Sequence, residues 1–198
     1  MTAPLPPSFF QRDALTVARA LLGKILVSRM SGVEVRVRLT ETEAYHQSER
    51  GSHTYGGRRT VRTEPMFAAG GISYVYFVYG MHWQFNVVTG EPDVGEAVLL
   101  RAGVPLTDAD ARAVAQRRFG EKSPPREVAK WCNGPAKLTQ ALALDKSVNA
   151  LALTPEHGVW LEDAPDVDES QVARLPRVGI AYAKEDAALP WRFLMSRD

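Results

Sequence analysis

Two glutamates separated by one residue, in the segment LTETEAY at 39–45, are the side chains with the clearest capacity for chemistry. Residues 33–39 alternate apolar and polar side chains, as a strand with one buried face does. Continuing this alternation places Glu41, Glu43 and Tyr45 on the buried side. An ionised carboxylate is costly there unless it has partners or lines a cleft, and a carboxylate that lines a cleft can serve as a general base.

The alternation leaves other arrangements open. A β-bulge or a strand end in the same segment would return both glutamates to solvent, and the spacing does not choose between Glu41 and Glu43. A metal site is not indicated, because His46 and His53 together with Glu43 fit no common ligand spacing. The single cysteine, Cys132, excludes an internal disulfide and lies in no catalytic-triad signature.

The segment ISYVYFVYGMHWQFNVV at 72–88 predicts a β-hairpin with Tyr79-Gly80-Met81 at its tip. Both faces of its first half are apolar or aromatic. A hairpin tip usually carries polar turn-forming residues, so a tyrosine and a methionine leave apolar surface where water is normally found. The tip either inserts into a partner or is covered by another loop of the domain.

Basic residues concentrate in two places. The loop HQSERGSHTYGGRRTVRT at 46–63 carries several arginines, which either fix the loop or contact phosphate. Residues 101–137 hold eight Lys/Arg and four Asp/Glu in a chain whose net charge is +1. This stretch is either a phosphate-binding face or a solvated helix surface, and Lys137 lies beside a predicted helix start that could hold a phosphate.

Composition limits the class of protein. A chain of 198 residues, 45% hydrophobic and 24% charged, predicts one domain, 1–198. No stretch approaches the ~18 apolar residues of a membrane span, and the N-terminal residues lack the features of a signal peptide. We therefore expect a cytoplasmic protein.

The remaining pattern predicts the elements that position these residues. Helices are expected at about 13–22, 108–119 and 133–144, with one helical turn at 65–69. Strands in a mostly antiparallel arrangement are expected at 24–30, 33–45, 72–79, 82–88, 97–102, 157–162, 176–183 and 192–195. Residues 1–7 contain three prolines, and we expect a flexible arm there.

Seven segments occur in order along the chain: LTETEAY, HTYGGR, RTEPMF, YVYFVYGMHWQFNVV, VLLRA, NGPAKL and PRVGIA. None is diagnostic alone, but the ordered set is specific and spans residues 39–181. Through it the chain closely resembles the alkyladenine (3-methyladenine) DNA glycosylases. The resemblance implies an α+β fold, a single mixed domain with a curved, mostly antiparallel, open-barrel-like sheet, peripheral helices and a protruding β-hairpin.

The same resemblance implies an activity. Members of this family remove alkylated or otherwise damaged purines from double-stranded DNA after base flipping, in base excision repair, without a metal or cofactor. We therefore expect a monofunctional, monomeric DNA glycosylase, associated with the nucleoid. By motif, Glu43 resembles the water-activating base of the family. Arg101 and the backbone carbonyl of Val178 resemble the groups that help to hold the water.

The resemblance also implies the residues that contact DNA. Tyr45, His53 and Tyr76 resemble the residues that enclose the extruded base, and Asn86 resembles the filter against the exocyclic amino group of normal guanine. Tyr79 matches the wedge that fills the gap left in the duplex. The other residues expected to contact DNA are Met81, Arg58, Arg62 and Lys137.

The chemistry agrees with these roles. A base inside a duplex must be rotated out, and a stacking wedge offsets part of the lost stacking. An N-alkylated purine is cationic and leaves readily, so one carboxylate suffices, whereas a neutral lesion needs a proton donor that the sequence does not identify. Two other classes stay open: a protein that binds distorted DNA or RNA without chemistry, and a small-molecule transferase that shares the curved sheet.

Overall fold

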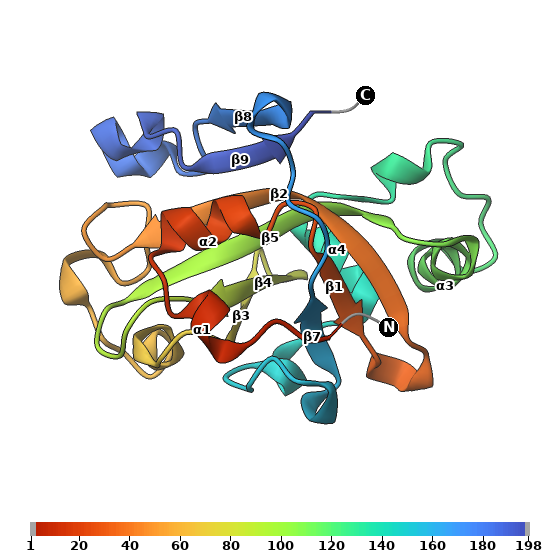
Figure 1. Ribbon diagram of the computed structural model, residues 1–198, viewed down its shortest axis with the longest axis horizontal. Helices are drawn as coiled ribbons and strands as arrows, with labels where there is room; N and C mark the ends of the chain where they lie inside the picture. The colour runs from red at the N-terminus through yellow and green to blue at the C-terminus, as the bar shows by residue number, and fades with distance from the viewer. Residues whose placement is uncertain (1–2, 197–198) are drawn as a thin grey trace.

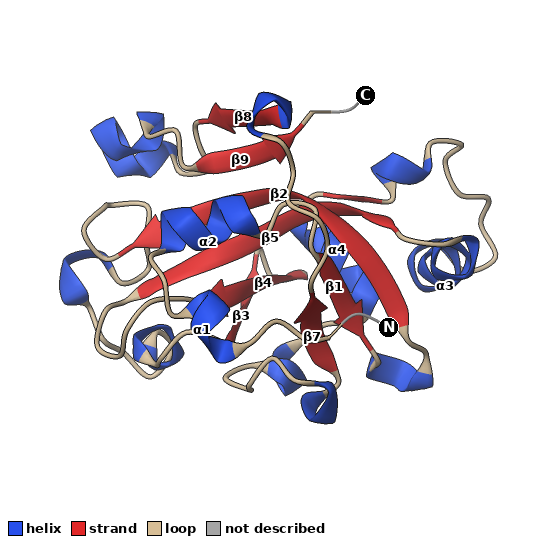
Figure 2. Ribbon diagram, in the orientation of Figure 1, coloured by secondary structure: helices blue, strands red, loops and turns tan. Residues whose placement is uncertain are grey.

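The computed structural model describes residues 3–196, and within them nine strands form one curved antiparallel sheet (Figures 1 and 2). The sheet order is β3-β4-β5-β2-β1-β7, while β9 pairs with β2 and β8, and β6 pairs with β5. The strands are β1 (Ile25–Ser28), β2 (Val35–His46), β3 (Ser73–Val78), β4 (His82–Val88), β5 (Glu96–Pro105), β6 (Cys132–Asn133), β7 (Val159–Glu162), β8 (Val172–Leu175) and β9 (Arg192–Met195). The predicted single α+β domain with a curved, mostly antiparallel sheet is confirmed.

The helices lie around this sheet. They are α1 (Pro7–Phe10), α2 (Ala14–Ala20), α3 (Asp108–Phe119) and α4 (Pro135–Leu142) within residues 3–196. The side chain of Asp13 accepts the Thr16 N–H at 2.9 Å and so starts α2, and Thr107 and Asp110 form a reciprocal capping box at the start of α3. None of the helices in residues 3–196 is long and apolar enough to cross a lipid bilayer.

Strand β2 contains an irregularity where the two glutamates begin. Its pairing with β5 shifts register on both sides of Glu41, and such a bulge turns the following side chains to the other face. Thr42 and Ala44 therefore face the main core, where the Thr42 hydroxyl donates to the Ala18 carbonyl oxygen of α2 at 2.8 Å. Glu43 is turned away from this core.

Both expectations for this segment are thus wrong in part. The bulge exists, so the alternation does not continue past it, but Glu43 does not reach solvent. Strand β9 pairs with β2 at Glu41–Glu43, and the backbone of Val178 contacts the carboxylate. Strand β9 thus continues the sheet beside β2, and the Val178 loop lies over its second face, where Glu43 is fully buried.

The predicted hairpin is formed by β3 and β4. Ser73 lies opposite Val87 at its base, and Val78 lies opposite His82 next to the tip. Its tip is a tight turn in which the Met81 N–H donates to the Val78 carbonyl oxygen at 3.2 Å. Tyr79 and Gly80 both have positive φ, 53° and 67°, as in a type I′ turn, where asparagine and glycine are usual. Tyr79 is 82% exposed and Met81 66% exposed, so no other part of residues 3–196 covers the tip.

Two sequence predictions are wrong. The strand expected at 176–183 is an irregular loop followed by a 3-10 helix, Ala181–Ala188, and the strand is β8, immediately before it. Pro176 has no N–H for a ladder, and the Val178 N–H binds Glu43. In the expected flexible arm, Met1 and Thr2 lie outside the described residues, but Leu5 is buried and its N–H donates to the Leu161 carbonyl oxygen at 2.8 Å. Burial of this leucine anchors the segment.

Candidate active site

Glu43 accepts three hydrogen bonds although it has no exposed surface. Its Oε1 accepts the Val178 N–H at 2.7 Å, and its Oε2 accepts the Tyr45 hydroxyl at 2.8 Å and an N–H of Arg101 at 3.2 Å. A carboxylate offers about four lone-pair positions. One lone-pair position on Oε1 is therefore unused by residues 3–196.

A second carboxylate lies beside Glu43 and binds two arginines. Glu41 Oε1 accepts from Arg101 Nε at 2.9 Å and from Arg192 at 3.0 Å. Burial raises the pKa of Glu43, while the charge of Arg101 and the hydrogen bonds from Val178 and Tyr45 oppose that rise. All three partners are donors, so the geometry fits the ionised carboxylate. A raised pKa makes it a stronger proton acceptor than an exposed carboxylate.

A buried ion pair holds the Val178 loop in place. Arg177 makes two hydrogen bonds of 2.7 Å to Glu49 and a third, of 2.9 Å, to the Ala44 carbonyl oxygen. Its side chain has no exposed surface, and that of Glu49 is 3% exposed. The guanidinium also stacks on Tyr45, 4.7 Å from the ring centroid, and on Trp191, at 5.1 Å. These contacts fix the loop and Tyr45 relative to β2.

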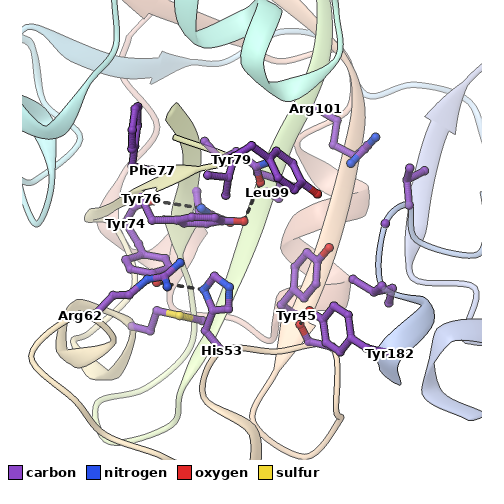
Figure 3. A pocket seen from close by; sticks show the side chains of 18 residues that line it. Tyr45, His53, Arg62, Tyr74, Tyr76, Phe77, Tyr79, Leu99, Arg101 and Tyr182 are labelled. Carbon is purple, nitrogen blue, oxygen red and sulfur yellow. Dashed lines mark hydrogen bonds between the residues drawn. The ribbon is translucent and has the colours of Figure 1, made fainter. Parts of the chain in front are cut away.

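The three partners of Glu43 line a cavity of about 330 Å³, within the roughly 300–1,000 Å³ of small-ligand sites. Aromatic rings from β2, β3 and the 46–63 loop form its walls (Figure 3). Tyr74 and Tyr76 lie side by side on β3, with ring centroids 5.4 Å apart, and the His53 ring packs edge-on against Tyr76 at 4.7 Å. Such walls suit a flat aromatic ligand.

Two polar side chains of the cavity have fixed hydrogen-bond partners. Asn86 is buried and its side-chain amide donates to the Tyr74 carbonyl oxygen at 3.0 Å. The Tyr76 hydroxyl donates to Gln84 Oε1 at 2.6 Å. Burial, together with the charge of Arg62, lowers the pKa of His53 to about 4, so this histidine is neutral near pH 7.

The hairpin tip stands at the rim of the same cavity. Tyr79 is among the lining residues, as are Phe77 and Val78 of β3 and, from the C-terminal part of the chain, Val178 and Tyr182. Figure 3 shows Tyr79 on one side of the cavity and Tyr182 with Tyr45 on the other. An exposed ring therefore stands at the rim of the cavity that the partners of Glu43 line.

Comparison with known proteins agrees with this geometry. Residues 8–198 match the model of the methylpurine-DNA glycosylase (MPG) family. The chain is 45% identical over 189 residues to a putative 3-methyladenine DNA glycosylase of Clostridium botulinum, with 93% of this chain and 92% of the relative covered. It is 40% identical over 198 residues to the DNA-3-methyladenine glycosylase of Mus musculus, with 96% and 58% covered. The chain belongs to the methylpurine-DNA glycosylase family.

The structure brings most of the expected family residues together. Those that line the cavity or bind Glu43 are Tyr45, His53, Arg62, Tyr76, Tyr79, Asn86, Arg101 and Val178. Val178 contacts Glu43 through its N–H, a contact that the resemblance did not include.

Three residues expected to contact DNA lie outside the cavity. Arg58 is exposed and lines a neighbouring groove with Arg62. Met81, at the hairpin tip, lines a groove between the hairpin and α4. Lys137, in the first turn of α4, donates to Asn133 Oδ1 at 2.6 Å, and this helix start is tied to the site because the Gly134 N–H donates to the Arg101 carbonyl oxygen at 3.0 Å.

The sequence did not reveal several residues that support the site or line it. Arg177 lies inside the PRVGIA segment, so a signal was present, but its role needs the fold. Glu49 is an acidic residue in a polar loop and gives no signal of burial. Tyr182, beyond the same segment, was also missed, as was the position of Glu41 between two arginines.

Proposed function

We propose that this chain is a monofunctional DNA glycosylase that hydrolyses the N-glycosidic bond of alkylated or otherwise damaged purines in double-stranded DNA, as a step of base excision repair. The observation that carries the proposal is the placement of Glu43. It is a fully buried carboxylate whose hydrogen-bond partners line an aromatic cavity, and an exposed tyrosine stands at the rim of that cavity.

The unused lone pair of Glu43 Oε1 accepts a hydrogen bond from the attacking water. Arg101 and the backbone carbonyl of Val178 help to hold that water. The water oxygen bonds to the anomeric carbon of the sugar, and Glu43 takes a proton from that water. The glycosidic bond breaks and the base leaves with its bonding electrons, so an N-alkylated base departs neutral. The ionised carboxylate also stabilises positive charge that develops on the sugar.

The aromatic walls select the base. The base enters between Tyr45 on one side and His53 and Tyr76 on the other. Electron-rich tyrosine faces favour a cationic base over a neutral one by roughly 0.5–2 kcal/mol. Asn86 excludes normal guanine by contact with its exocyclic amino group, because a buried polar group left unpaired is costly.

The hairpin opens the duplex. Tyr79 inserts where the nucleotide has left and stacks on the neighbouring bases, with Met81 beside it. Arg58, Arg62 and Lys137 contact phosphates around the extruded nucleotide. The protein acts as a monomer on the nucleoid.

A base-release assay tests the proposal. Duplexes that carry one methylated or one deaminated purine are incubated with the protein, and free base and abasic sites are measured. Release from at least one alkylated duplex is expected. Tight, lesion-specific binding without release would mean a binding protein, and DNA affinity that does not depend on salt would favour the small-molecule transferase.

A further inference from the structure

The two ring nitrogens of His53 have different surroundings. Nδ1 lies 3.0 Å from the hydroxyl oxygen of Tyr74. Nε2 has no hydrogen-bond partner among residues 3–196, and it is not one of the buried unpaired atoms. Figure 3 shows the Tyr74 contact on one side of the ring and the cavity on the other. The group that His53 offers to a ligand is therefore set by which nitrogen carries the proton.

Tyr74 determines this choice. Its side chain is buried, with 2% of the residue exposed. Burial raises the pKa of Tyr74 and the nearby charge of Arg62 opposes that rise, so the hydroxyl keeps its proton near pH 7. A protonated hydroxyl has one hydrogen to donate.

The proton of the Tyr74 hydroxyl then needs an acceptor. His53 Nδ1 is the one acceptor within hydrogen-bond distance among residues 3–196. If Nδ1 carried a proton, the hydroxyl hydrogen would be buried without a partner, and that arrangement is costly. The bond therefore runs from Tyr74 to Nδ1.

We propose that Tyr74 is a positioning residue that holds His53 in the Nε2–H tautomer, so that the cavity presents a neutral hydrogen-bond donor to an acceptor atom of the extruded nucleotide. The inference rests on the proposed function. The acceptor is a ring nitrogen or carbonyl oxygen of the base, or an oxygen of its sugar. Both a cationic alkylated purine and a neutral deaminated purine offer such atoms. The ring itself adds no charge to the cavity, because burial and the charge of Arg62 lower the pKa of His53.

Nitrogen NMR of the histidine side chains tests the tautomer without any activity. The chain has four histidines, and a His53→Ala variant identifies the signals of His53. Near pH 7 we expect a protonated Nε2 and an unprotonated Nδ1 in the wild-type protein, and a mixture of tautomers in Tyr74→Phe, which lacks the donor. Tyr76→Phe is the matched control, because its hydroxyl binds Gln84 instead, and it should keep the single tautomer. Protonation of Nδ1 in the wild type, or an unchanged tautomer in Tyr74→Phe, would overturn the proposal.

A double-mutant cycle tests the functional consequence. Base release from the best methylated duplex is measured for the wild type, Tyr74→Phe, His53→Ala and the double variant. Tyr74→Phe should lose about two- to tenfold, the effect of one hydrogen bond. In the His53→Ala background it should lose nothing more, because it acts through His53. Independent, multiplying losses would contradict the proposed role.

The NMR measurement and the base-release assay test the two proposals separately. A wild-type protein that releases no base refutes the proposed function, while its spectrum still decides the tautomer. If Tyr74→Phe does not fold, the wild-type spectrum alone decides it.

Discussion

Glu43→Gln is the most direct test of the proposed chemistry, because it removes the charge and the basicity of one buried group with almost no change in shape. A general base contributes about 10²–10⁴-fold to a rate, or roughly 3–5 kcal/mol of activation free energy. The lost negative charge beside the developing positive sugar adds to this. We therefore expect single-turnover base release from a methylated duplex to fall by at least about 10²-fold.

The structure indicates that this variant keeps its fold and its DNA affinity. The glutamine oxygen can still accept the Val178 N–H, and the Tyr45 hydroxyl can rotate to accept from the new amide. Arg101 keeps its 2.9 Å bond to Glu41. Because burial raises the pKa of Glu43, its charge is itself unfavourable to the folded state, so the free energy of unfolding should change by about 1 kcal/mol or less. Affinity for lesion duplex, measured by titration, should stay unchanged.

Glu41→Gln is the matched control. Glu41 shares Arg101 with Glu43, but the hydrogen bonds from Val178 and Tyr45 go to Glu43. Its loss removes charge-assisted hydrogen bonds without removing the base, so release should stay within about tenfold of wild type. Wild-type activity in Glu43→Gln, or an equal loss in both variants, would refute the assignment of the base.

The pH dependence supplies a second measurement on the same variants. The active form of Glu43 is ionised, so release should increase as pH rises through its pKa. Since burial raises that pKa, the midpoint should lie above the ordinary glutamate value of about 4.3. The acid limb should be missing from the residual activity of Glu43→Gln. A midpoint at or below the ordinary value would contradict the buried site.

Four further outcomes are expected. Tyr79→Ser should weaken lesion-duplex binding by about 1–3 kcal/mol, whereas Tyr79→Phe keeps the ring and should bind normally; equal affinities would show that the tip does not insert. Arg62→Ala should reduce the slope of log affinity against log salt by about 0.9. Arg59→Ala should leave that slope unchanged, because Arg59 already pairs with two carboxylates. Equal slopes for both variants would show that Arg62 does not contact phosphate. The pKa of His53 is lowered to about 4, so between about pH 6.5 and pH 4 the unfolded chain binds a proton that the folded chain does not. The free energy of unfolding should therefore decline by up to roughly 3 kcal/mol as pH falls through this range. His53→Gln should flatten that decline, and an identical profile would argue against the buried neutral ring. Arg177→Met should cost roughly 3–5 kcal/mol of unfolding free energy in urea, because it leaves the Glu49 carboxylate buried and unpaired; a loss below about 1 kcal/mol would mean that the pair is not buried in solution.

The hairpin shows how far local pattern reaches. Period-two alternation and Gly80 locate both strands and the tip from the sequence, because pairing between neighbouring segments depends on residues close in the chain. The exposure of Tyr79 could not be predicted, since whether a loop covers a hairpin tip depends on parts of the chain far from it in sequence. Its positive φ also runs against the residue type, and a strained residue at a tip is a feature of functional sites rather than of sequence preference.

The glutamates show where pattern fails. Alternation places them correctly in a strand, but a single bulge reverses every side chain beyond it. The resemblance to a family names Glu43, yet nothing local shows why it is buried and satisfied. Its partner Val178 lies 135 residues later in the chain, in a segment that the sequence predicts as a strand.

By itself, the sequence determined the domain, most of the strands, the aromatic hairpin and the family, because these depend on periodicity and on ordered motifs within short segments. The tertiary structure alone decided which face of the sheet holds Glu43 and which nitrogen of His53 faces the cavity. It also decided that the ion pair of Arg177 and Glu49 fixes the Val178 loop. Each of these depends on hydrogen bonds between segments far apart in the chain, and a buried polar group is stable only where such partners meet it.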